Sequence, residues 1–84
     1  MTEINYSKFR SLTARELINA LGREGFYPRI RSGAHRQYRH PDGRRVTVSY
    51  HRGSDTFTFK TLKSMIEKQA KWTEEDLKRL KLLK

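Results

Sequence analysis

The chain has 84 residues, and its 19 basic and 9 acidic side chains give it a formal net charge of +10. This length suits one small domain that buries about 60 to 65 % of its unfolded surface, so its core must be modest. Without cysteine the chain forms no disulfide and no thiolate metal site, and with only three scattered histidines we expect no zinc or other cofactor.

The sequence contains no continuous apolar run of the kind found in a secretory signal or a membrane-spanning helix. We therefore expect a cytoplasmic location and no membrane partner. The strong positive charge favours a polyanion or an acidic protein as partner, because either would relieve the repulsion within the compact chain.

A helix is predicted to begin just after Thr13. Thr13 and Glu16 have the spacing of a capping box, in which each side chain bonds the backbone amide of the other residue. Flanking leucines have the spacing of a hydrophobic staple, and apolar residues then recur on one helical face. We expect Gly22 or Gly25 to end this helix.

A meander of three antiparallel strands is predicted between residues 26 and 50, because apolar and polar residues alternate there with a period of two. Turns are expected at Ser32-Gly33 and at Pro41–Gly43. The expected inward positions are Phe26, Pro28 and Ile30 in the first strand, Tyr38 in the second, and Val46, Val48 and Tyr50 in the third. The expected outward positions are Tyr27, Arg29, Arg31, His35, Gln37, Arg39, Thr47 and Ser49, whereas Arg36 shares the face of Tyr38.

Two helices are predicted after a loop at residues 51–59. Leu62, Met65 and Ile66 follow helical spacing with Thr61 as the expected N-cap, and residues 72–77 repeat the start signature of the first helix. We therefore predict a single α+β domain over residues 1–84, in the order α-β-β-β-α. Its core spans about residues 12–71, a short extra helix spans about 73–83, and helices cover one face of the sheet.

The positive charge is concentrated between residues 23 and 52, where arginine is used and lysine is not. Arginine can hold a phosphate at two points through its planar guanidinium, so this region favours nucleic-acid binding over an ordinary solvated surface. Tyr27 can stack on a base or pack at a strand edge. The arginines are Arg23, Arg29, Arg31, Arg36, Arg39, Arg44, Arg45 and Arg52.

His35 is the candidate general base. Neighbouring cations favour a neutral imidazole, which can accept a proton. Beside bound RNA that proton would come from a ribose 2′-hydroxyl, whose oxygen would attack the adjacent phosphorus while arginines stabilise the developing charge. On spacing alone, however, a lone histidine among arginines is more often a surface residue than a catalyst. We assign His40 to the Pro41–Gly43 turn, and His51 is a candidate auxiliary acid or base.

Two runs, EGFYPRIRSGAHRQYRHPDGRRVTVSYH and KTLKSMIEKQAKWTEEDL, carry a Gly-X-His turn, His-Pro-Asp-Gly-Arg, Val-Thr-Val with a histidine three residues beyond, and Lys-Gln-Ala. They resemble the HicA (YcfA-like) toxins of bacterial toxin–antitoxin pairs, which are mRNA interferases, over roughly residues 12–77. The resemblance implies a fold like that of the double-stranded-RNA-binding domain and a single catalytic histidine at His35. It also implies a HicB-type antitoxin that covers the active site.

The chain differs from this family at two positions. Ala34 stands where the family usually has serine, which removes one hydrogen bond that a hydroxyl could make on the active strand. Lys60 stands where the family usually has glycine before Thr61, and its ammonium group can face a phosphate near the second helix's N-terminus.

These observations favour a metal-independent endoribonuclease, the toxin of a type II toxin–antitoxin pair. In this hypothesis Arg29, Arg31, Arg36 and Arg39 hold the scissile phosphate around His35, with Arg36 the weakest candidate because of its strand parity; Tyr27 and Lys60 are further RNA contacts. A second hypothesis is an RNA-binding module that uses the same basic sheet without chemistry. A third is a structural partner whose charge is neutralised by an acidic protein.

Overall fold

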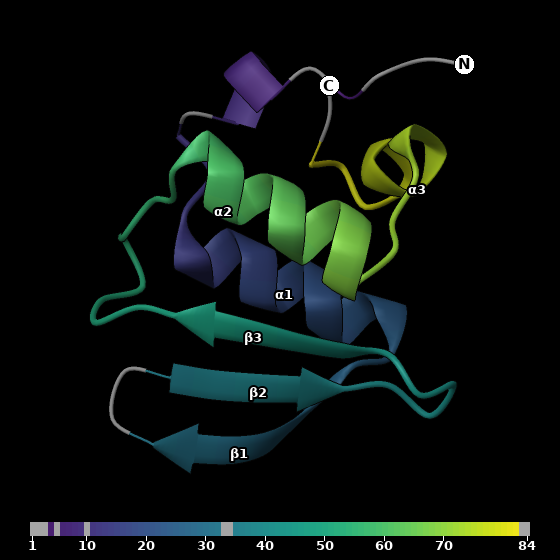
Figure 1. The fold of residues 1–84 in the computed structure, drawn as a ribbon. Helices are drawn as coiled ribbons and strands as arrows, with labels where there is room; N and C mark the ends of the chain where they lie inside the picture. The colour runs from purple at the N-terminus through teal and green to yellow at the C-terminus, as the bar shows by residue number, and fades with distance from the viewer. Residues whose placement is uncertain (1–3, 5, 10, 33–34, 83–84) are drawn as a thin grey trace.

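The computed structural model describes residues 4, 6–9, 11–32 and 35–82 (Figure 1). Its one sheet is antiparallel with strand order β1-β2-β3, which confirms the predicted α+β arrangement of a helix, three strands and further helices. None of the helices in these ranges is long and apolar enough to cross a membrane. The elements are the 3-10 helix η1 (Tyr6–Phe9), α1 (Ala14–Glu24), β1 (Tyr27–Ser32), β2 (His35–Arg39), β3 (Arg45–Ser49), α2 (Phe59–Lys63), the π-helical segment η2 (Ser64–Gln69) and α3 (Glu74–Arg79).

Two sets of hydrogen bonds fix the start of α1. The predicted capping box is present, with the Glu16 amide donating to the Thr13 hydroxyl at 3.2 Å and the Thr13 amide to the Glu16 carboxylate at 3.0 Å. The loop after β3 then supplies acceptors for the next amides, because Ala14 N–H donates to the Asp55 carbonyl at 2.8 Å. Helix α1 is therefore tied at its first turn to the loop that leaves β3.

One hydrophobic core lies between α1, the inner face of the sheet and the later helices. Strand β3 contributes most from the sheet, with Val46 and Val48 both fully buried, and Tyr38 of β2 is 8 % exposed. Both α1 and α2 lie beside β3, while β1 forms the far edge of the sheet (Figure 1). Burial of each such side chain contributes on the order of 1.5 to 3 kcal/mol, so β3 is the strand that anchors the sheet.

Strand β1 departs from the predicted alternation. Its pairing with β2 shifts between Pro28 and Ile30, so that Arg29 has no partner residue in the ladder. Pro28 is exposed, and its predicted inward position was wrong, because an edge strand with an inserted residue does not keep a strict period of two. The side chains of Ile30 and Arg31 lie outside those that the structure describes, as does the Gly33 half of the expected Ser32-Gly33 turn.

The second helical segment begins earlier than predicted. Its N-cap is Thr58, whose hydroxyl accepts the Thr61 amide at 3.2 Å, so the expectation that Thr61 caps it was wrong. The segment widens from α2 into the π-helix η2 and ends with the Ala70 amide bonded to the Met65 carbonyl. The third helix keeps its predicted capping box, between Thr73 and Asp76.

Residues before and after the predicted core segment, about 12–71, also pack into the hydrophobic core. Phe9 of η1 is 1 % exposed, and Leu77 and Leu80 of the C-terminal segment are buried in the same cluster. The hydroxyl of Tyr6 donates to the Glu67 carboxylate, which ties η1 to η2. Burial, with the Glu67 carboxylate adding to it, raises the pKa of the Tyr6 hydroxyl.

His40 joins the β2–β3 turn to the end of α1. Its Nε2 lies 3.0 Å from the Glu24 carbonyl, and the Asp42 amide donates to its Nδ1 at 3.1 Å. The ring also meets the edge of Phe26, with centroids 4.9 Å apart. These contacts give His40 the structural role assigned from its place beside the turn.

The two glycines near the end of α1 should respond oppositely to alanine. Gly25 has φ +104°, and a Cβ there would lie 3.1 Å from His40 Nε2, so Gly25→Ala should lower the free energy of unfolding by about 1 to 2 kcal/mol or more. Gly22 is helical with open space around it, so Gly22→Ala should raise that free energy by about 0.5 to 1 kcal/mol. Urea unfolding of both variants measures this, and equal shifts of the two would contradict the account.

The histidines should also differ in their effect on stability. His40→Ala removes a packed ring and two hydrogen bonds, which should cost about 1 to 3 kcal/mol in urea unfolding. The exposed His35 is the matched comparison, and His35→Ala should stay within about 0.5 kcal/mol of the parent chain. A large loss at His35 would mean that this side chain has a structural duty.

Candidate nucleic-acid interface

The face of the sheet turned away from the core carries polar and basic side chains. In the β2–β3 ladder, residues directly opposite each other share a face, and the pairs of the non-core face are His35 with Ser49, Gln37 with Thr47, and Arg39 with Arg45. We call these six residues the open face. The predicted parity of β2 and β3 is therefore confirmed, with Tyr38, Val46 and Val48 on the core face.

His35 and Ser49 form a contact at one end of the open face. His35 Nδ1 lies 2.6 Å from the Ser49 hydroxyl oxygen, and both residues are exposed. The other ring nitrogen, Nε2, has no hydrogen-bond partner among the side chains that the structure describes. The imidazole is thus held by one nitrogen and can offer the other to a ligand.

Two arginines lie at the other end of the open face. Arg39 and Arg45 stand directly opposite each other, and like charges in that position repel. Arg39 is held by its Nε, which donates to Gln37 Oε1 at 3.0 Å. Tyr27 pairs with Arg39 from β1 and is 45 % exposed, so it extends this row across all three strands. An anion bound between the two guanidinium groups would relieve their repulsion.

Three of the other arginines in the cluster stabilise the fold instead. Arg23 donates to the Leu80 carbonyl at 2.8 Å, and Arg44 donates to the Ala70 carbonyl at 2.6 Å. Arg36 lies on the core face with its guanidinium 4.5 Å from the centre of the Tyr50 ring. We therefore leave Arg36 out of the anion-binding set, as its strand parity had already suggested.

The remaining candidates lie at the margins of the open face or beyond it. Arg29 is exposed at the irregularity of β1, and Lys60 is exposed at the second residue of α2. His51 is exposed just after β3, and its amide donates to the Asp55 carboxylate at 2.9 Å. This amide, together with that of Arg52, holds the pKa of Asp55 below its usual value. Ala34 and the side chain of Arg31 lie outside the described part of the chain.

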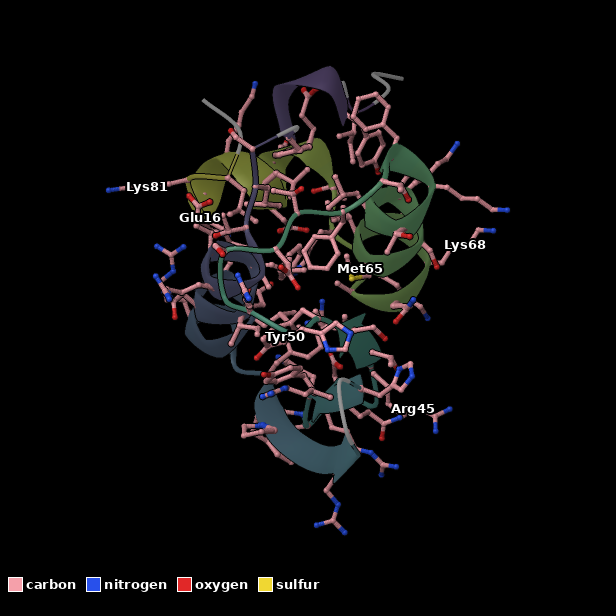
Figure 2. All side chains as sticks on the ribbon, turned by 90° about the vertical axis from the view of Figure 1, so that its left-hand side faces the viewer. Glu16, Arg45, Tyr50, Met65, Lys68 and Lys81 are labelled. Atoms are coloured by element: carbon pink, nitrogen blue, oxygen red, sulfur yellow. The ribbon has the colours of Figure 1, made fainter. Side chains whose placement is uncertain are left out.

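The η2 segment borders the open face along β3. Gln69 Oε1 accepts the Thr47 backbone amide at 2.8 Å, and Gln69 Nε2 donates to the Ser64 hydroxyl at 3.1 Å. Arg45 and Lys68 point toward the same side of the molecule (Figure 2). The basic surface therefore continues from the sheet onto the π-helical segment, a kind of irregularity that is frequent at functional sites.

A hollow on the opposite side of the molecule is separate from this surface. Glu16 and Lys81, which line it, point away from the side that carries Arg45 and Lys68 (Figure 2). The hollow mixes acidic, apolar and basic side chains, and it contains no histidine. In the described ranges no group of three or more histidine or acidic side chains is placed to hold a metal ion.

Ser49, Arg45 and Lys68 were not among the site residues predicted from sequence. The first two follow from counting across the Pro41–Gly43 turn, where the His40 amide donates to the Arg44 carbonyl and so sets Arg39 opposite Arg45. Ser49 then falls opposite His35. Lys68 depends on how η2 packs against β3, for which the local sequence contains no signal.

Comparison with known proteins places the chain in a family. No match was found among curated proteins. The family model for the HicA toxin of bacterial toxin–antitoxin systems matches residues 14–72, a stretch that includes α1, all three strands and η2. Because this match covers well over half of the chain, the protein belongs to the HicA toxin family of bacterial toxin–antitoxin systems.

Proposed function

We propose that this HicA-family toxin is an endoribonuclease that cleaves mRNA, with His35 as general base and without a metal ion. The observation that carries the proposal is the open face itself, where an exposed imidazole held by Nδ1 shares one surface with the facing pair Arg39 and Arg45. An anionic chain laid across that surface would meet both groups at once. Cleavage of mRNA would in turn inhibit growth of the cell.

In the proposed reaction, His35 Nε2 takes the proton of a ribose 2′-hydroxyl. The 2′-oxygen then bonds to the adjacent phosphorus, the bond from phosphorus to the 5′-oxygen breaks, and that oxygen takes a proton from a general acid, for which His51 is the candidate, or from water. The products are a 2′,3′-cyclic phosphate and a free 5′-hydroxyl. Cationic side chains stabilise the charge that develops on the phosphoryl oxygens.

The candidate arginines fall into two groups according to their distance from His35. Arg39 is four residues further along β2, about 13 Å in backbone rise, so we assign Arg39 and Arg45 to neighbouring phosphates of the same RNA chain. Arg29, at the irregularity of β1, remains a candidate for the scissile phosphate. Arg31 is the weaker candidate, because the ladder sets it opposite Arg36, which lies on the core face. Tyr27 is a candidate stacking platform for a base.

Lys68 and Lys60, both exposed on the α2–η2 segment, are candidates for further backbone contacts. His51, which follows β3 closely, remains a candidate auxiliary acid or base.

Family membership implies a cognate antitoxin, and we propose that it is a HicB-type protein that covers the open face. The chain's charge of +10 favours an acidic contact surface on that partner. Such a complex would bury His35 and the Arg39–Arg45 pair together, so antitoxin and RNA would compete for one surface.

A second candidate function is RNA binding without cleavage, and the Arg39–Arg45 pair alone supports it. This function requires no proton acceptor at His35. It predicts that RNA stays intact after long incubation with the pure protein.

His35→Ala should lower the rate of RNA cleavage at least 100-fold, because general base catalysis contributes roughly 10²- to 10⁴-fold. The assay incubates parent and variant with RNA in the presence of chelator and identifies the product ends, which should carry 2′,3′-cyclic phosphate. Overlapping urea unfolding curves would show that the variant is folded. An alanine variant as active as the parent would remove His35 from the mechanism.

Arg39→Gln and Arg45→Gln should each weaken RNA binding and reduce its log–log salt slope by about one unit. Binding is measured on the His35→Ala background so that the RNA remains intact. Lys81→Gln is the matched control, because it removes the same charge from the opposite side of the molecule (Figure 2). Equal slope changes in all three variants would mean that net charge, and not the open face, determines binding.

A further inference from the structure

We propose that Ser49 is a positioning residue that sets the tautomer and direction of the His35 ring. In this arrangement the ring carries its proton on Nδ1 and donates it to the Ser49 hydroxyl oxygen, 2.6 Å away. The lone pair of Nε2 is then turned outward on the open face. The catalytic consequence rests on the proposed function, whereas the tautomer is a property of the free protein.

Ser49 is well placed to hold an exposed ring. It lies directly opposite His35 in the ladder, where the Cβ atoms of paired residues are about 4.5 to 5.5 Å apart. The residue before it, Val48, is fully buried, and the Thr47 amide is bonded to Gln69 at the free edge of β3. The hydroxyl therefore stands on the best-anchored strand, while His35 alone would be free to turn.

The proposed role of His35 as a base requires that Nδ1 donates the hydrogen bond to the Ser49 hydroxyl. A neutral imidazole has one N–H and one lone pair, so the partner of Nδ1 determines the state of Nε2. If the Ser49 hydroxyl donated to Nδ1, Nε2 would carry the proton and could accept none. With Nδ1–H as donor, Nε2 is a base, and the same bond persists when Nε2 becomes protonated.

His40 provides an internal reference with the opposite arrangement. Its Nε2 faces the Glu24 carbonyl, an acceptor, so the neutral ring carries the proton on Nε2. Its Nδ1 accepts from the Asp42 amide, and an Asp42 carboxylate oxygen lies 3.0 Å from the same nitrogen. In this proposal the chain holds two histidines in different tautomers, with Ser49 fixing His35 at Nδ1 and the Glu24 carbonyl fixing His40 at Nε2. Because Ala34 has no hydroxyl, the residue before His35 cannot act in place of Ser49.

The test is nitrogen NMR of the full-length chain at a pH where both rings are neutral. The parent should show His35 with its proton on Nδ1 and His40 with its proton on Nε2. Ser49→Ala should remove the Nδ1 preference of His35 and leave His40 unchanged, and Ser49→Thr should restore it. Ser54→Ala, the same chemical change in the exposed loop after β3, should alter neither ring.

An identical His35 spectrum in parent and Ser49→Ala would overturn the proposal, as would a parent whose His35 carries its proton on Nε2. Kinetics test the consequence: Ser49→Ala should lower kcat on RNA by roughly 10- to 100-fold with little change in KM, by analogy with other residues that orient a histidine. Ser49→Thr should recover most of the loss, and an unchanged kcat in Ser49→Ala would also overturn the role. If the parent cleaves no RNA, the proposed function fails. The NMR measurement of the His35 tautomer then still tests the role of Ser49.

Discussion

The register of β2 against β3 is the constraint on which the candidate site depends. A slip of one residue would move every side chain of a strand to the other face of the sheet. The register is held by Val46 and Val48, which are fully buried, and by the turn in which His40 contacts the end of α1. Since the apolar residues must face the core, the alternate residues between them are placed together on the open face. The site is therefore a direct consequence of how the core packs.

The arginines of the cluster serve two purposes that composition alone does not separate. Arg44 and Arg23 donate to carbonyls at the ends of helical segments, where they satisfy backbone groups and connect distant parts of the chain. Arg39 and Arg45 instead stand opposite each other on two paired strands, where like charges are destabilising. In the proposed function, this pair would gain more from a phosphate, or from the acidic groups of an antitoxin, than scattered charges would.

Features that depend on a few neighbouring residues were predictable from the sequence, whereas features that depend on strand pairing also require the register of the two strands. Both threonine-based capping boxes and the parity of β2 follow from local spacing, and the structure confirms them. The irregularity at Arg29 is possible because an edge strand tolerates an unpaired residue. No local sequence pattern predicts it. Thr58 and Thr61 are both suitable N-cap residues, and in the structure the Thr58 hydroxyl accepts the Thr61 amide. Ser49 became visible as a partner only once two strands were set in register.

Chemical-shift mapping with RNA tests most directly whether the open face is the functional surface. The experiment titrates the parent chain with a short oligoribonucleotide that is 2′-O-methylated throughout, so that it can bind but cannot be cleaved. The account predicts that the largest shifts occur at His35, Ser49, Arg39 and Arg45, with little change around Glu16 and Lys81 on the opposite side. Shifts centred on that opposite side, or spread evenly over all exposed basic residues, would contradict it.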